Sequence, residues 1–169
     1  PLVFFVPFPT VDIWYFLIAT TILHGFYRYS VIASYNYADL SFVYPIARGG
    51  SCFIIGVISL FLLSNNISFF GIIGILVTCL GLFMISFMSA KKFNQKGFLL
   101  AILTAVLIAT YTIIDGIGVR NTENAFTYIF WMLLLNGIPM LIYALISKNG
   151  FRKKNTYSLI EGTSAGVLA

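Results

Sequence analysis

Ionisable side chains within long apolar segments are the residues of this chain best placed to do chemistry. Arg48 lies inside the apolar run 38–63, three residues after Pro45 and directly before Gly49 and Gly50. A guanidinium at that depth in a bilayer is costly unless it faces protein, water or a counter-charge. Two roles are open for it. Arg48 either binds an anionic group of a substrate or is a structural arginine bonded to carbonyls that the proline frees.

The residues around Arg48 extend this polar pattern. Ser41, Tyr44, Arg48 and Ser51 recur at spacings of three, four and three residues. A helix would therefore place them in one polar stripe. Asp39 precedes the stripe, where an acidic side chain favours a helix N-terminus, so capping is its expected role.

A second apolar segment carries His24 and Arg28, four residues apart and so on one helical face. A histidine titrates near neutrality and suits a proton relay in a transporter. A hydrogen-bonded packing role for His24 is the alternative. Arg28 lies nearer the expected cytoplasmic end, and its side chain is expected to reach the lipid headgroups.

A third apolar segment places Thr104, Ile108, Tyr111 and Asp115 on one side, with Asp115 toward the expected outer end. A buried carboxyl group there is suited to binding a proton or an organic cation. Pairing with Arg120, just beyond the segment, is the alternative that the spacing leaves open.

The elements that hold these residues are expected to be membrane-spanning helices. Of the 169 residues, 60% are hydrophobic and 9% charged, and the mean hydropathy is +0.97. Five apolar runs reach the roughly 20 residues that cross a bilayer as helix: 11–34, 40–63, 68–87, 97–119 and 125–147. A sixth begins near Thr156. Continuous runs of this length are not the alternating segments of a β-barrel, so the predicted fold is an all-α polytopic transmembrane helix bundle.

The basic residues indicate an orientation. The connections after the first, third and fifth spans share one side of the membrane and hold most of the ten Lys and Arg residues: Lys91, Lys92, Lys96, Lys148, Arg152, Lys153 and Lys154. Only Arg120 falls on the other side. These three connections are therefore expected to be cytoplasmic, and no nucleic-acid partner is needed to explain the net charge.

Several kinds of chemistry are not expected. One histidine and two widely spaced cysteines do not make a zinc site, and Cys52 and Cys79 are expected to be reduced core residues. The chain has no phosphate-binding GxxxxGK[ST] loop and no GxSxG or HExxH motif. No enzyme activity, catalytic residue, metal or cofactor is therefore predicted.

Three further patterns concern packing. Small residues share one helical face, which would allow close approach of another helix: Gly71, Gly74, Thr78 and Gly81. Aromatic residues near predicted helix ends favour an interfacial belt: Trp14, Tyr15, Tyr35, Tyr37, Tyr128 and Trp131. Asn136, Gly137 and Pro139 interrupt the fifth span, which fits either a plain kink or a discontinuous helix beside a pathway.

Two segments, 37–49 and 109–120, resemble the signature of EamA-type permeases in the drug/metabolite transporter superfamily, and His24 fits the pattern of the preceding span. The resemblance covers nearly the whole chain. It implies part of a ten-helix transporter built as two inverted five-helix repeats. Residues 1–119 would form most of the first repeat without its first helix, and 120–169 the start of the second. One departure is Ser64-Asn65-Asn66, where members often carry Gly-Glu.

The resemblance implies a secondary transporter of a small polar metabolite or drug, working by alternating access, with proton coupling left open. Tyr44, Arg48, Tyr111 and Asp115 are expected to line the pathway, with His24 a weaker candidate. The expected partners are the lipid bilayer, a small-molecule substrate and the remainder of a full-length chain; a homodimer is left open. The expected location is a bacterial inner membrane. The rival hypothesis is a non-transporting membrane assembly or scaffold subunit.

Overall fold

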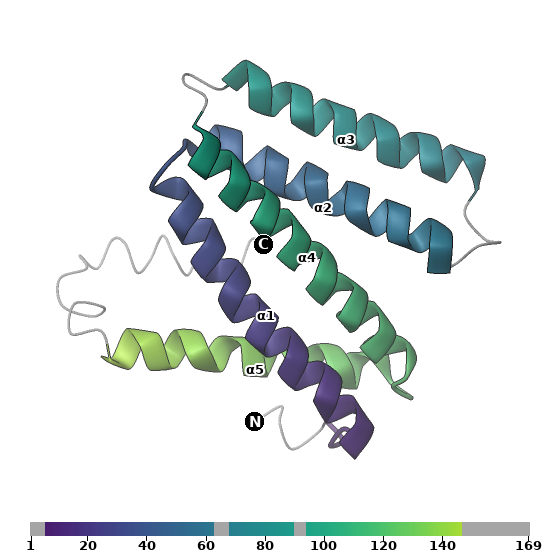
Figure 1. Ribbon diagram of the computed structural model, residues 1–169. Helices are drawn as coiled ribbons and strands as arrows, with labels where there is room; N and C mark the ends of the chain where they lie inside the picture. The colour runs from purple at the N-terminus through teal and green to yellow at the C-terminus, as the bar shows by residue number, and fades with distance from the viewer. Residues whose placement is uncertain (1–5, 63–67, 90–93, 147–169) are drawn as a thin grey trace, which may run out of the picture. The chain divides into compact units, whose positions relative to one another are not determined.

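The structure, a computed structural model, describes residues 6–62, 68–89 and 94–146. Over these ranges the chain forms five α-helices and no strand (Figure 1): α1 (Val11–Tyr35), α2 (Leu40–Leu62), α3 (Phe69–Ser89), α4 (Gln95–Arg120) and α5 (Ala125–Ile146). The predicted all-helical fold is confirmed, and each predicted span ends within two residues of an observed helix end. The sixth apolar run and the segment 64–66 lie outside the described residues.

Helices α1 to α4 are long and apolar enough to cross a bilayer. The side chains of α5 are described only as far as Gly137. This part of α5, Ala125–Gly137, is apolar but shorter than a bilayer span. Large apolar side chains are exposed along α3, among them Phe70, Val77 and Met88. A soluble domain rarely exposes so much apolar surface, so the chain is that of a membrane-embedded helical protein.

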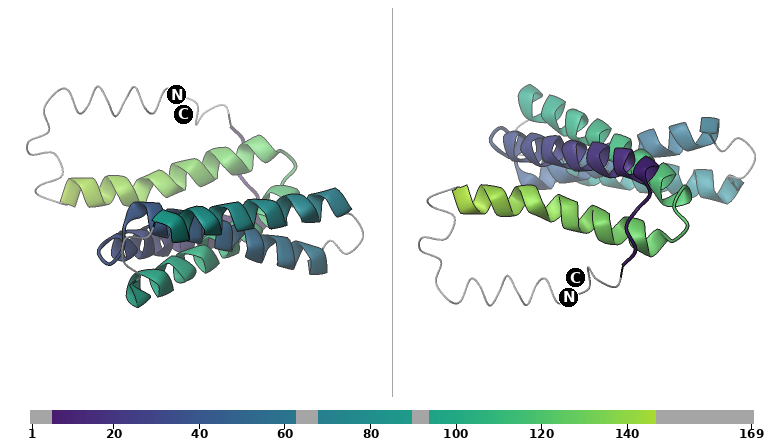
Figure 2. Two further views of the ribbon diagram at one scale, coloured as in Figure 1. Left: turned by 90° about the horizontal axis from the view of Figure 1, so that it is seen from above. Right: turned by 90° about the horizontal axis from the view of Figure 1, so that it is seen from below.

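Helix α4 packs against both α1 and α2, and in the described chain α3 packs on α2 (Figure 1). Figure 2 shows the same arrangement from two further directions. Close approach depends on glycines. A Cβ added to Gly50 of α2 would lie 2.9 Å from the Cβ of Ala105 in α4, and one added to Gly97 would lie 2.6 Å from the Cβ of Ala38. These contacts bring α4 against the middle of α2 and, at its own first turn, against the connection that precedes α2.

The α2–α4 contact contains a buried apolar cluster made of Phe42, Val43, Ile46 and Ala101. Hydroxyl groups join the helices around it. The Oγ atoms of Ser30 in α1 and Thr104 in α4 lie 2.8 Å apart. Between α3 and α2, the hydroxyl of Ser86 donates to the carbonyl oxygen of Phe42 at 2.6 Å. Such interhelical bonds have value in a bilayer because water does not compete for them.

Replacing Ser86 with alanine is expected to lower stability by about 0.5–1.5 kcal/mol, since a buried interhelical hydrogen bond is lost. Thr78→Ala is a matched control on the same helix, because the Thr78 hydroxyl is exposed and bonds to Gly74 of its own helix at 2.8 Å. The measurement is the fraction of folded protein at increasing concentrations of a denaturing detergent, which gives a midpoint of unfolding for each variant. Equal midpoints for the two variants would contradict the assignment.

The small-residue face of α3 does not pack as the sequence predicted. A Cβ added to Gly74 or Gly81 would meet nothing within 4 Å, and Gly71 and Thr78 are exposed. The glycines that allow α2 and α3 to approach belong to α2 instead. A Cβ added to Gly49 would lie 3.1 Å from Cβ of Leu82 in α3, and one added to Gly56 would lie 3.0 Å from Cγ2 of Ile75 in α3. In the described chain, therefore, the small-residue face of α3 receives no helix.

Helix α5 continues through Asn136, Gly137 and Pro139 without a break. The discontinuous helix that the sequence left open is thus not formed. The chain divides into two compact units, residues 1–132 and 133–169, so the first two turns of α5 belong to the first unit. This division into compact units does not test the repeat boundary near residue 120 that the resemblance implies, which stays a prediction.

Candidate functional site

Arg48 lies on an exposed face of α2 together with Ser41, Tyr44 and Cys52. Its guanidinium carbon is 5.7 Å from the centroid of the Tyr44 ring, within cation–π range. Ser51, expected on the same stripe, is instead 2% exposed, and its hydroxyl donates to the carbonyl oxygen of Arg48 at 2.9 Å. The exposed stripe is therefore Ser41, Tyr44 and Arg48, continued by the thiol of Cys52.

A pocket of about 60 Å³, here called the Arg48 pocket, opens beside this stripe between α1, α2 and α4. Its lining residues are Tyr27, Val31, Tyr35, Val43, Tyr44, Ala47, Arg48, Thr104 and Ile108. Helix α1 contributes three of them at spacings of four residues, which places them on one face. Sequence reasoning missed Tyr27 and assigned Tyr35 only to the interfacial belt. The spacing Tyr27, Val31, Tyr35 was the signal that pointed to them.

An aromatic cluster continues from the Arg48 pocket along α1 and α4. The ring of Tyr111 is 5.8 Å from that of Tyr27 and 4.0 Å from that of His24, centroid to centroid. Nδ1 of His24 lies 2.9 Å from the carbonyl oxygen of Thr20 and 3.3 Å from its hydroxyl. This local bonding favours the packing interpretation of His24, although its ring still borders the cluster.

Asp115 lies apart from the Arg48 pocket. Its carboxylate accepts a hydrogen bond of 2.8 Å from the hydroxyl of Tyr128, so the partner that the structure gives it is Tyr128 rather than Arg120. Tyr128 is fully buried (0% exposed), which corrects its expected place in an interfacial belt. The ring fits there because Gly118 has no side chain, and a Cβ at Gly118 would collide with it.

Trp131 is also buried rather than interfacial. Its indole N–H donates to the carbonyl oxygen of Pro7 at 3.2 Å, and its ring lies 4.9 Å from that of Phe8 and 5.6 Å from that of Trp14. By contrast, Tyr15 of α1 is exposed, as a belt residue would be. The buried aromatic residues of α5 hold its first turns against α1 and α4.

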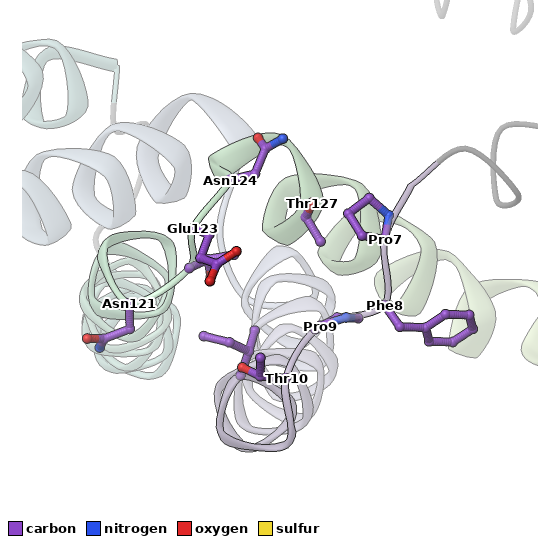
Figure 3. Close-up of a pocket in the computed structure, with 10 residues that line it drawn as sticks. Pro7, Phe8, Pro9, Thr10, Asn121, Glu123, Asn124 and Thr127 are labelled. Carbon is purple, nitrogen blue, oxygen red and sulfur yellow. The ribbon is translucent and has the colours of Figure 1, made fainter.

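A second pocket, here called the Glu123 pocket, has a volume of about 190 Å³ and lies where α1 begins and α4 ends. Figure 3 shows its lining residues, with the ring of Phe8 extending away from the other side chains. Glu123 is the one acidic or basic residue among them. The hydroxyl of Thr127 is buried there without a hydrogen-bond partner. No residue of this pocket was singled out from the sequence.

The structure therefore brings Tyr44 and Arg48 together and links Tyr111 to His24, while Asp115 is bonded elsewhere. In the described part of the chain, no group of three or more His, Cys, Asp or Glu side chains is arranged to hold a metal ion. Both cysteines are free thiols; Cys79 is buried as expected, but Cys52 is exposed. The chain matches no protein-family model, no curated protein and no solved structure.

Proposed function

We propose that the chain is part of a secondary transporter that moves a small polar metabolite or drug across a membrane by alternating access. The observation that carries the proposal is Arg48, a permanent cation on a bilayer-length helix beside a pocket formed by three helices. A charge at such a position is costly in lipid and is normally retained for a pathway or a ligand. On this proposal, Tyr44 in the lining of the pocket and Tyr111 in the adjoining aromatic cluster also line the route.

The resemblance to EamA-type permeases supports the same proposal. Its two segments, 37–49 and 109–120, cover the start of α2 and the last part of α4, and they contain Tyr44, Arg48, Tyr111 and Asp115. On this proposal the chain belongs to a ten-helix, inverted-repeat transporter of a bacterial inner membrane. The connections after α1, α3 and α5 would face the cytoplasm.

The native thiols provide a test against the scaffold alternative. Cys52 lies one turn after Arg48 on the exposed face of α2, whereas Cys79 is buried against the carbonyl oxygen of Gly49. A water-filled pathway would let Cys52 react with a membrane-impermeant thiosulfonate, because the reactive thiolate forms only where water reaches the thiol. We expect labelling of one thiol per chain, and faster labelling by an anionic reagent than by a cationic one.

The matched controls are Cys52→Ser, which should abolish labelling, and Cys79→Ser, which should leave it unchanged. Cysteines placed at positions 44 and 111 extend the test along the same face. Protection of all three positions in intact membranes would favour a scaffold subunit whose polar residues only join helices.

A further inference from the structure

We propose that the Arg48 pocket takes a small organic monoanion, a carboxylate on a flat apolar body, in preference to an amino acid or an amine. The inference rests on the proposed transport function and narrows its substrate class. It depends on the charges around the pocket, on the pocket's size and on the rings that border it.

The lining supplies positive charge and hydrogen-bond donors. Arg48 is the only residue of the lining that is charged at neutral pH, and its planar donors match a carboxylate. Tyr27, Tyr35 and Tyr44 add phenolic hydroxyl groups that can donate. The hydroxyl of Thr104 is already bonded, at 2.8 Å to the carbonyl oxygen of Leu100. Arg48 and the three phenolic hydroxyl groups therefore favour a negatively charged group on the ligand.

In the described part of the chain, no carboxylate lines the Arg48 pocket, where the ammonium group of an amino acid would lie. Asp115 follows Ile108 by seven residues, which is about 10 Å along a helix, and it already accepts the bond from Tyr128. Asp39 precedes Arg48 by nine residues, about 13 Å along a helix. A buried ammonium without a counter-charge costs several kcal/mol, so the pocket should discriminate against zwitterions and against amines.

The size of the pocket indicates which part of the ligand lies inside it and which part lies outside. At about 60 Å³, the Arg48 pocket is about a third of the size of the Glu123 pocket, which has about 190 Å³. A carboxylate group fits, but the body of the ligand must extend outward. The body of the ligand then contacts aromatic rings. Tyr44 is 51% exposed, and the ring of Tyr27 contacts the rings of Tyr111 and His24. Flat unsaturated bodies stack well on such rings.

The test compares three ligands of one skeleton with the full chain in nanodiscs: 3-phenylpropionate, phenylalanine and 2-phenylethylamine. The first lacks the ammonium group and the last lacks the carboxylate. Titration calorimetry should show 3-phenylpropionate binding at least about tenfold more tightly than either other ligand, a free-energy difference of about 1.4 kcal/mol. Replacing the phenyl ring by a cyclohexyl ring should weaken binding.

Two variants locate the site. Arg48→Gln should weaken binding of 3-phenylpropionate by about tenfold or more, because a charge-assisted contact is lost. Glu123→Gln, which removes the one charge of the other pocket, should leave that binding unchanged. A loss with Glu123→Gln alone would overturn the assignment.

Three results would overturn the substrate class: phenylalanine binding as tightly as 3-phenylpropionate, 2-phenylethylamine binding most tightly, or no binding by any of the three ligands. If Cys52 is labelled from water in the same preparation, the transport proposal survives and only the substrate class fails. If Cys52 and the cysteines placed at positions 44 and 111 are also protected, both proposals fail.

Discussion

Arg48→Gln is expected to reduce transport by about tenfold or more. The reason is that a hydrogen bond to a charged group contributes about 1.5–3 kcal/mol, and this substitution removes it. The substitution keeps a polar, hydrogen-bonding side chain, although a shorter one, and removes the permanent charge beside the Arg48 pocket. Arg48→Lys should retain part of the activity, because a point charge remains while the planar donor pair is lost. The measurement is uptake into proteoliposomes that contain equal amounts of folded protein.

Arg120→Gln is the matched control. It removes the same charge from the exposed last residue of α4, away from the Arg48 pocket. Uptake should stay within about twofold of that of the unchanged chain, because most substitutions of exposed residues change stability by about 0.5 kcal/mol or less. Normal uptake by folded Arg48→Gln would remove the main support for a transport pathway at α2.

Gly118→Ala is expected to destabilise the protein more than any other single methyl addition in the described part of α4. The new Cβ would lie 2.7 Å from both Cζ and the hydroxyl oxygen of Tyr128 and closer still to Cε2. The ring is fully buried and bonded to Asp115, so it cannot move without breaking that bond. Overpacking typically costs about 1–3 kcal/mol, and the loss of the bond adds to it. Thermal unfolding in detergent measures the sum.

Gly116→Ala is a close control on the same helix, because a Cβ there meets nothing within 4 Å. It should be neutral or raise stability by up to about 1 kcal/mol, the usual helix-propensity gain over glycine. In a Tyr128→Ala background, Gly118→Ala should cost little, since the opposing ring is gone. Equal melting temperatures for the two glycine variants would contradict the contact.

The helices were predictable from sequence because one physical requirement dominates their composition. A span of a bilayer needs about 20 mostly apolar residues with satisfied backbone groups, and α1 to α4 are long and apolar enough to meet this requirement. The side of α2 that bears Tyr44 and Arg48 was equally predictable, since helical spacing fixes it. Ser51 was assigned to that stripe wrongly, because at about 100° per residue it lies at the edge of the stripe beside the buried Ala47.

Contacts between helices were the part that spacing could not predict. The stripe of small residues on α3 has the same pattern as a packing face, yet the approach of α2 and α3 uses Gly49 and Gly56 of α2. Tyr128 looked interfacial because it lies near a helix end, but a partner thirteen residues earlier in the chain, Asp115, draws it inward. Which neighbour a residue meets depends on helix pairing, and a single sequence does not encode pairing locally.

Helix α5 begins in one compact unit and continues into the next. Its first turns are fastened by the bond between Tyr128 and Asp115 and by the indole of Trp131. Both contacts lie before Leu133, so they fix only the part of α5 that belongs to the first unit. The remaining turns of the helix continue beyond the last of these anchors.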